Sequence, residues 1–306
     1  MAPLKSRRQF IINLGSLAAL SALPSRAVTP DSSEIRFAYA SITWGGQDLQ
    51  AITEIGEVGF RGIQLRAPIL KSFGDKPSAL ADLLKQHGLR FVALSGGGPS
   101  GYDYREEEVV AAQVKHSTFL RAAGGLYLQM TDSSRPKDRK PGREDFKKLG
   151  RVLSEVGKRA ADMGVVMAYH NHMNSLGEAP GEVDQVMDAA DPRYAKLLLD
   201  VAHYAQGGGD PAKAILKYRD RILFLHIKDV ETLAHGAAGE ESKSYRFVEL
   251  GRGRVDLPAV FAALKEIKFR GWAVVELDSV PDETRTPKES AIISKRYIEE
   301  KLRMKI

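Results

Sequence analysis

The sequence predicts an α/β protein, a single-domain (β/α)₈ TIM barrel. From residue 35 onward, short apolar runs alternate with longer amphipathic stretches, which is the pattern of βα units around a parallel sheet. Eight such pairs fill about 270 residues, the usual size of this barrel. A doubly wound open sheet is the alternative, but eight sequential units without a long interruption close more naturally into a barrel.

Strands are predicted where short apolar runs are bounded by turn residues. They are expected at residues 35–42, 62–65, 90–94, 126–130, 165–169, 196–199, 222–227 and 272–277. Two longer insertions, 131–142 and 229–250, follow the fourth and seventh strands. In a barrel these loops lie at the carboxyl ends of the strands, where active sites are built.

Helices are predicted between the strands from amphipathic periodicity and from start and stop signals. They are expected at residues 48–58, 78–87, 105–123, 143–163, 182–190, 211–218, 257–267 and 287–303. Asp210 and Asp256 are predicted N-caps because a proline follows each in the first turn. The predicted C-caps are Gly59, Gly88, Gly124, Gly164 and Gly271, each of which stands just before a strand.

The first 27 residues predict a twin-arginine export signal. Arg7 and Arg8 precede a short, weakly apolar run, and small residues precede a cut after Ala27. An N-terminal membrane anchor is the alternative, but the run is shorter than the roughly 20 residues that a span requires, so no stable membrane span is expected. We therefore expect export by the twin-arginine machinery to the periplasm or medium, a short linker at 28–34 and a barrel at 35–306.

The composition narrows the function classes further. Of 45 Lys and Arg, four lie in the leader, which leaves 41 basic against 39 acidic side chains, a net charge of +2. Such a nearly neutral chain has little electrostatic reason to bind nucleic acid. The absence of Cys excludes disulfides, a thiolate nucleophile and a cysteine-ligated zinc site. A homo-oligomer is left open.

Polar groups stand at the carboxyl ends of the last four predicted strands. They are His170, Asp200, His226 and Glu276. Because these strand ends converge at one mouth of a barrel, and because burying such groups without a partner is costly, they predict a metal site. Two imidazoles and two carboxylates suit one divalent ion, Mn²⁺, Co²⁺, Fe²⁺ or Zn²⁺, and suit Mg²⁺ less.

The stretch from Tyr169 to Glu276 resembles the xylose-isomerase-like TIM barrel superfamily, which includes sugar-phosphate isomerases and epimerases, inosose dehydratases and endonuclease IV. The matching pieces are Leu198-Leu199-Asp200 followed by His203, then His226-Ile227-Lys228-Asp229, Gly251-x-Gly253-x-Val255-Asp256 and Gly271-Trp272-x-Val274-Val275-Glu276. The resemblance implies metal ligation by Asp200, His226 and Glu276. It also implies a small-molecule sugar or keto-polyol as the substrate.

Two positions depart from the family pattern. His170 stands where members typically carry a metal-binding Glu, and Gln64 stands where they usually carry Glu on the second strand. Ketose epimerases of the family resemble a two-base machine with a glutamate on each face of the substrate. A His at position 170 does not supply the first carboxylate, and the run around it is more similar to the inosose dehydratase branch.

The resemblance implies a divalent-metal-dependent isomerase or epimerase that abstracts an α-proton and forms a metal-stabilised enediolate. A dehydratase or lyase acting on a keto-sugar or inosose, and a catalytically silent carbohydrate-binding barrel, are the alternatives. Glu276 and His203 are the candidates for proton transfer, with His203 expected on a loop just beyond Asp200. An endonuclease IV type of nuclease is disfavoured, because its three-metal cluster needs more ligands than the chain offers.

Four residues are candidate substrate contacts. They are Trp44, His172, Lys228 and Arg254. Lys228 and Arg254 are expected to hold hydroxyl or carboxylate groups, and Trp44 is expected to stack on a sugar face. Three of them have an ordinary alternative: a loop histidine at 172, a solvated basic loop around 254, and an aromatic ring at 44 that merely covers the core.

Overall fold

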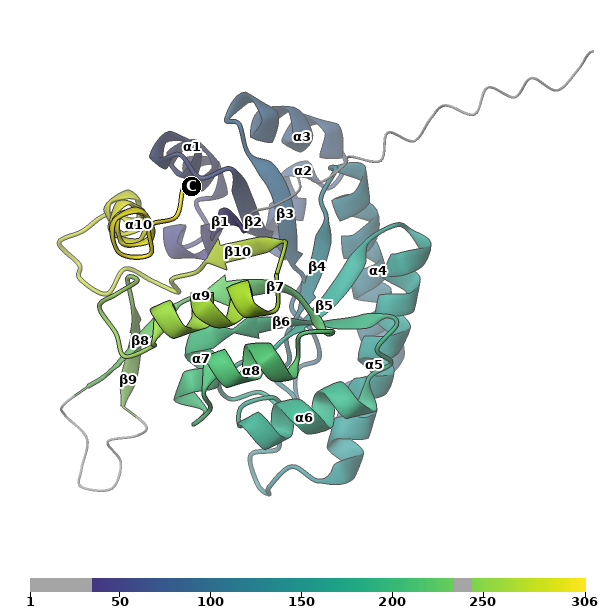
Figure 1. Cartoon of the computed structure of the whole chain (residues 1–306). Helices are drawn as coiled ribbons and strands as arrows, with labels where there is room; N and C mark the ends of the chain where they lie inside the picture. The colour runs from purple at the N-terminus through teal and green to yellow at the C-terminus, as the bar shows by residue number, and fades with distance from the viewer. Residues whose placement is uncertain (1–34, 234–243) are drawn as a thin grey trace, which may run out of the picture. The chain divides into compact units, whose positions relative to one another are not determined.

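The computed structural model describes residues 35–233 and 244–306, in which eight parallel strands form a closed barrel (Figure 1). The barrel strands are β1 (Arg36–Ala40), β2 (Gly62–Arg66), β3 (Arg90–Ser95), β4 (Tyr127–Met130), β5 (Val166–His170), β6 (Ala195–Asp200), β7 (Ile222–Ile227) and β10 (Trp272–Val275). β10 closes the ring by pairing with both β1 and β7. The predicted single-domain barrel and its eight strands are confirmed.

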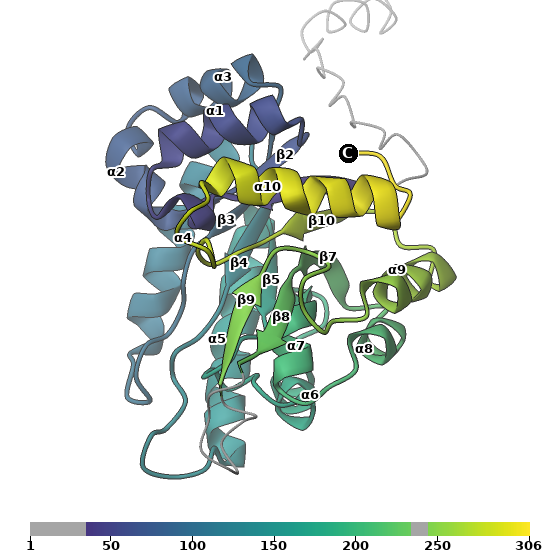
Figure 2. The ribbon, with the colours of Figure 1, turned by 90° about the vertical axis from the view of Figure 1, so that its left-hand side faces the viewer.

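Helices surround the strands on the outside of the ring (Figures 1 and 2). They are α1 (Asp48–Val58), α2 (Leu70–Phe73), α3 (Pro77–Gln86), α4 (Glu106–Ala122), α5 (Arg143–Asp162), α6 (Pro180–Ala189), α7 (Val201–Gln206), α8 (Pro211–Lys217), α9 (Leu257–Glu266) and α10 (Pro287–Arg296). A π-helical turn at Tyr297–Lys301 continues α10. α10 packs beside α1, where Lys295 donates to the Val58 carbonyl at 2.8 Å.

Most of the predicted helix caps are confirmed. The side chains of Asp210 and Asp256 accept hydrogen bonds from Lys213 N and Ala259 N at the starts of α8 and α9. Glycines 59, 88, 124 and 164 have positive φ angles. Gly271 is a correction: α9 ends earlier, and Lys268 takes the left-handed conformation with φ 54°. A Cβ at Gly271 would lie 2.7 Å from the Phe269 ring, so close packing explains this glycine.

Two short helices and a two-stranded hairpin were not predicted. α2 and α7 are the helices of four and six residues, and β8 (Asp229–Thr232) pairs with β9 (Tyr245–Val248) in an antiparallel hairpin outside the barrel. The hairpin occupies the predicted insertion at 229–250, of which 234–243 lie outside the described residues. The predicted export signal and linker, residues 1–34, also lie outside them.

Inward-facing side chains fill the barrel in layers. Large rings form the floor, where Tyr127 and Phe224 stack with centroids 5.1 Å apart and Trp272 lies in the same buried cluster. Above them, toward the carboxyl ends of the strands, the inward positions turn polar. Within residues 35–233 and 244–306, no helix has both the length and the apolar character needed to cross a membrane.

Candidate metal centre

A layer of buried polar side chains lies just above the apolar floor. Its members lie in the carboxyl-terminal part of their strands or just beyond: Gln64, Gln129, His170, Asp200, His226 and Glu276. The strands alternate their side chains between the two faces, so these positions all point into the barrel. The layer therefore sits where the sequence predicted a site.

The structure brings the four predicted metal ligands together. One donor atom from each of His170, Asp200, His226 and Glu276 lies within 4.8 Å of the others, and all four residues are buried. His226 Nδ1 lies 3.2 Å from Glu276 Oε1 and 3.5 Å from Asp200 Oδ2, and His170 Nε2 lies 3.4 Å from the same Asp200 oxygen. Imidazole nitrogens and carboxylate oxygens in this arrangement can hold a divalent cation.

Gln64 fixes which nitrogen of His226 faces the cluster. His226 Nε2 lies 3.0 Å from Gln64 Oε1, and because this oxygen can only accept, Nε2 carries the hydrogen. In the neutral imidazole the lone pair is then on Nδ1, which is buried without a hydrogen bond and points at two carboxylates. A metal ion satisfies such an atom, so the residues present fit a divalent cation.

Gln129 orients His170 in the same way that Gln64 orients His226. Its amide nitrogen lies 2.9 Å from His170 Nδ1, and its amide oxygen is buried without a partner. A half-turn of the amide exchanges the two atoms, so that the oxygen accepts from Nδ1–H. The lone pair of His170 Nε2 then faces Asp200, which is the orientation a metal ligand requires.

Asp200 divides its two oxygens between structure and site. Oδ1 accepts from Ala202 N at 2.9 Å and from His203 N at 2.8 Å, which caps α7. Oδ2 is left facing the imidazoles of His170 and His226. His203 thus lies in a helix, not on the loop that the sequence predicted, because the cap starts α7 directly at the end of β6.

The charges in the cluster are strongly coupled. Burial opposes the charged form of His226, but Glu276 and Asp200 outweigh it and raise its pKa to about 9. Burial and the neighbouring His226 lower the pKa of His170 to about 4. Burial also opposes ionisation of Glu276, yet His226 and Lys228 hold its pKa well below its usual range. A proton on His226 therefore occupies the place of a cation between two carboxylates.

A second polar layer lies two residues further along the strands. Lys228 is fully buried, and its ammonium group lies 3.2 Å from Glu276 Oε1, 2.6 Å from Asp278 Oδ1 and 3.3 Å from His203 Nε2. The Phe247 ring of the hairpin covers it at 4.0 Å. Burial disfavours this charge, but Glu276, Asp278 and Asp200 raise the pKa of Lys228, so it stays cationic.

A cavity of about 130 Å³ opens above the ligands. Its lining residues are Ala40, Ser41, Ile42, Gln64, Arg66, Ser95, Gln129, Thr131, His170, His172, Glu276 and Asp278. Of the predicted catalytic and substrate residues, Glu276 and His172 line it. Lys228 and His203 lie directly behind the lining, in contact with Asp278 or with His172.

Two predicted substrate contacts lie elsewhere. Trp44 is buried in the core against Tyr39, and its indole N–H donates to Glu54 Oε2 at 2.7 Å. Its ring covers the core because the chain turns away from the mouth in a 3₁₀ turn at Ser41–Trp44. Arg254 is exposed and donates to Gln206 Oε1 at 2.7 Å. Neither side chain is among those that line the cavity.

Several cavity residues were not predicted. Arg66, Gln129 and Thr131 lie at or just beyond the ends of β2 and β4, in strands where the sequence showed no His or carboxylate. The signal that could have found Arg66 is its spacing: it stands two residues after Gln64 and so faces the same side of the strand. Gln129 could be found by the same alternation.

Asp229 connects two motifs of the sequence, the run His226-Ile227-Lys228-Asp229 and the glycine-containing run from Gly251 to Asp256. Its carboxylate accepts from the backbone N–H groups of Gly251 and Gly253 at 3.0 and 2.9 Å, and from Val255 N at 3.0 Å. A Cβ at Gly253 would lie 2.2 Å from an Asp229 oxygen. The carboxylate therefore fastens the base of the hairpin next to Lys228.

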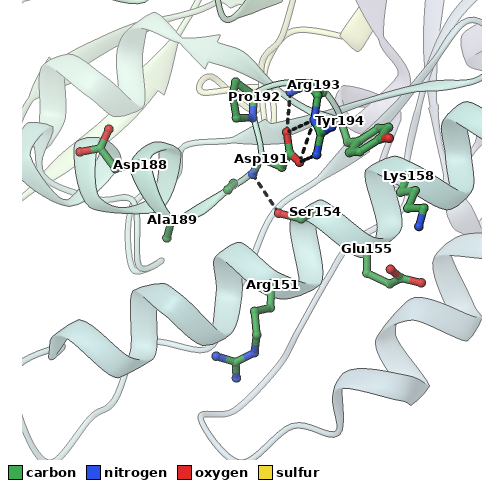
Figure 3. A pocket seen from close by; sticks show the side chains of 11 residues that line it. Arg151, Ser154, Glu155, Lys158, Asp188, Ala189, Asp191, Pro192, Arg193 and Tyr194 are labelled. Carbon is green, nitrogen blue, oxygen red and sulfur yellow. Dashed lines mark hydrogen bonds and ion pairs between the residues drawn. The ribbon is translucent and has the colours of Figure 1, made fainter.

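A wider hollow lies at the other end of the strands (Figure 3). It runs between α5 and the loop before β6. Arg193 bonds Asp191 at 2.6 Å, and Asp191 N donates to the Ser154 hydroxyl at 2.9 Å, while Arg151 and Glu155 pair with residues outside the hollow. None of the predicted site residues lines this hollow. It is open to solvent and has no connection with the metal ligands.

Comparison with known proteins agrees with the geometry. The family model of the xylose isomerase-like TIM barrel matches residues 52–298. The chain is 30% identical to the rhizopine catabolism protein MocC of Rhizobium meliloti in an alignment of 279 positions that covers 81% of this chain and 83% of that one. It is 27% identical to the inosose dehydratase of Lacticaseibacillus casei, covering 87% and 96% of the two chains.

Among solved structures, the chain is similar to the IOLI protein with a binding zinc atom. The TM-score is 0.70 and the identity 20%, and the match covers 87% of this chain and 97% of that one. At this identity the likeness shows the fold.

Proposed function

This chain is an enzyme of the xylose isomerase-like TIM barrel family, in its inosose dehydratase-like branch, and from that premise we propose that it is a divalent-metal-dependent lyase that removes water from a keto-polyol or keto-sugar. The observation that carries the choice of reaction is the pair of histidines at the end of β5 and just beyond it. His170 replaces a carboxylate in the ligand layer, and His172 is left as an imidazole base in the wall of the cavity.

His172 is oriented to accept a proton. Its Nδ1–H donates to the Met173 carbonyl at 2.7 Å, which places the lone pair on Nε2. The ring packs against His203 with centroids 3.8 Å apart, so its plane is held. The structure favours His172 over His203 as the base, because His203 is buried behind the lining and burial beside Lys228 keeps its pKa well below the ordinary value.

A bound metal would be held by His170, Asp200, His226 and Glu276. When bound, such a cation supplies a Lewis acid that acidifies the hydrogen on the carbon next to a substrate carbonyl group and stabilises the charge that develops on the oxygen. The ligand atoms lie directly beneath the cavity, within reach of a substrate that also contacts His172.

The proposed step needs one base. His172 Nε2 takes the proton from the carbon next to the carbonyl, and the electron pair of the broken C–H bond forms a C=C bond to the next carbon. The C–O bond on that carbon breaks, and the leaving hydroxide takes the proton back from His172 to depart as water. Lys228 keeps Glu276 and Asp278 in place through its two short contacts.

An isomerase is the second candidate, and one observation favours it over a two-base epimerase. Both oxygens of Glu276 are engaged, Oε1 by Lys228 and His226 and Oε2 by the Gln64 amide. A second free carboxylate base is therefore not available from this residue. Isomerisation begins with the same proton transfer to one base and differs in where the proton returns.

The test is turnover in D₂O by the full-length protein loaded with Mn²⁺ and supplied with an inosose or with the ketohexoses D-fructose and D-tagatose. Loss of one water, read by mass spectrometry, supports the lyase, and deuterium uptake without loss of water supports the isomerase. His172→Asn is expected to lower either rate at least 100-fold without loss of metal. His87→Asn, at the end of α3, is the matched control.

An unchanged rate in His172→Asn contradicts the assigned base. Metal-independent binding of these sugars without turnover would instead favour the carbohydrate-binding alternative.

Export by the twin-arginine pathway is a separate proposal. It is supported by the paired Arg7 and Arg8, the short apolar run and the small residues before position 28. Replacing both arginines by lysine is expected to retain the protein in the cytoplasm of a twin-arginine-competent host, as measured by cell fractionation. Unchanged export of the Lys-Lys variant would contradict the proposal.

A further inference from the structure

Arg66 is a cation in the cavity wall, and the described residues supply no partner for it. It is the last residue of β2, and its side chain lines the cavity with Gln129 and His172. Its Nε–H is buried and makes no hydrogen bond. Within the described part of the chain, no residue forms a hydrogen bond or an ion pair with the guanidinium group, so a buried donor is left unsatisfied at the site.

Among the described residues, no carboxylate forms an ion pair or a hydrogen bond with the Arg66 guanidinium group. Asp48 is the acidic group whose pKa responds to Arg66, but burial raises that pKa, and the carboxylate is bonded to the Ser41 hydroxyl at 3.1 Å. Asp278, on the same cavity wall, is held by Lys228 at 2.6 Å. Asp278 is thus paired with another cation, Asp48 is bonded to a neutral hydroxyl, and neither forms an ion pair with Arg66.

The two cations near the cavity, Lys228 and Arg66, therefore differ in whether their charge is paired. Lys228 is buried under Phe247 and balanced by Glu276 and Asp278, which makes it part of the wall. Arg66 lines the cavity and forms no ion pair with any described residue. An arginine presents donors in a planar fork that matches the two oxygens of a carboxylate.

We propose that Arg66 binds a carboxylate group of the substrate, so that the enzyme acts on an acidic keto-sugar or keto-polyol in preference to a neutral one. The proposal rests on the proposed function for its choice of a sugar-like substrate. The uncharged neighbours of Arg66 in the cavity, Ser95, Gln129 and Thr131, offer hydrogen bonds to hydroxyl groups. A substrate placed this way has its acidic end at β2 and its reacting carbons over the ligands.

The test is the binding, by isothermal titration calorimetry, of sugars that differ in one carboxylate. D-glucuronate and D-galacturonate are compared with D-glucose and D-galactose, and D-glucose 6-phosphate is included, all on the Mn²⁺-loaded full-length protein. Each uronate is expected to bind at least tenfold more tightly than its hexose. Arg66→Gln is expected to remove this preference and to leave the hexose affinities within about twofold.

Two further variants test whether the preference depends on the shape of the guanidinium group and on its position in the cavity. Arg66→Lys keeps the charge without the fork and is expected to retain part of the preference. Arg61 is exposed and immediately precedes the first residue of β2. Arg61→Gln is therefore the matched control and is expected to retain the full preference for uronates.

The proposal is overturned if uronates and hexoses bind equally, if Arg66→Gln keeps the preference, or if the phosphate ester shows the larger Arg66-dependent gain. Binding is measured without turnover, so its outcome is independent of the proposed reaction. Loss of turnover in His172→Asn with an unchanged preference in Arg66→Gln would refute this inference alone. An Arg66-dependent preference in a protein that neither binds metal nor turns over would refute the proposed function alone.

Discussion

Replacing Gln64 with Leu tests how the ligand layer is held in place. The amide oxygen accepts from His226 Nε2–H at 3.0 Å, and the amide nitrogen donates to Glu276 Oε2 at 3.3 Å. Leucine nearly preserves the volume of the side chain but removes both bonds. The fully buried His226 N–H then has no partner among its described neighbours, and Glu276 loses the group that holds its second oxygen.

The expected cost follows from these two contacts. A buried donor left unsatisfied costs about 1–3 kcal/mol of folding free energy. The imidazole of His226 is also freed to change its tautomer or rotate, and losing the group that orients a ligand typically weakens metal affinity about 10–100-fold. Competition for Zn²⁺ against a chromophoric chelator measures the affinity. Urea unfolding of the metal-free protein measures the stability.

Two companion variants sharpen the result. Gln50→Leu removes an exposed amide bonded to Glu54 on α1 and is expected to change neither quantity. Gln64→Glu keeps an acceptor for His226 and is expected to lose less metal affinity than Gln64→Leu. If Gln64→Leu binds zinc as tightly as the parent protein, the amide does not orient His226 and the reasoning fails.

Three other predictions follow from the same contacts. Because the pKa of His226 is raised to about 9, the metal-free imidazole is protonated below that pH and must release a proton to bind metal. Metal affinity, measured by chelator competition, is therefore expected to rise about tenfold per pH unit between about pH 6 and 8. An affinity that does not change with pH would contradict this. Asp200→Ala is expected to abolish stoichiometric metal in elemental analysis after gel filtration, and one retained ion per chain would remove Asp200 from the ligand set. Gly253→Ala places a Cβ 2.2 Å from Asp229 Oδ1 and is expected to cost about 1–3 kcal/mol in urea unfolding. Gly181→Ala, where no atom lies within 4 Å, is expected to show no such loss, and an equal loss in both would refute the steric argument.

The barrel could be predicted because its signals are local and repeated. Each strand is a short apolar run, and the predicted helices have either amphipathic periodicity or a start signal such as the caps Asp210 and Asp256. The four predicted ligands were found because His and carboxylates at strand ends are rare and costly to bury. α7 was missed because six residues carry too little periodicity, and its cap is a predicted ligand, Asp200.

The roles of the remaining cavity residues could not be predicted, because they depend on contacts between segments that are far apart in the sequence. Gln129 and Gln64 look like ordinary strand residues until the barrel closes and places each against an imidazole nitrogen. Trp44 stands close to a strand end in the sequence, but the 3₁₀ turn after β1 carries its ring into the core. Arg66 could not be predicted because it matters for the hydrogen bonds and ion pairs that the described residues do not form with it, and these are known only from the folded structure.

The closure of the barrel by β10 has a consequence for the order of events during synthesis. Glu276 is the last ligand along the chain, and it follows the strand that pairs with both β1 and β7. It also meets Gln64 across 212 residues of sequence. A nascent chain can present His170 and Asp200 early, but it cannot hold the ion with all four donors until the ribosome has released the final strand. Binding of an ion by all four donors would therefore require that β10 has been synthesised and that the ring has shut, and chains truncated before β10 would lack the stabilisation that such binding confers.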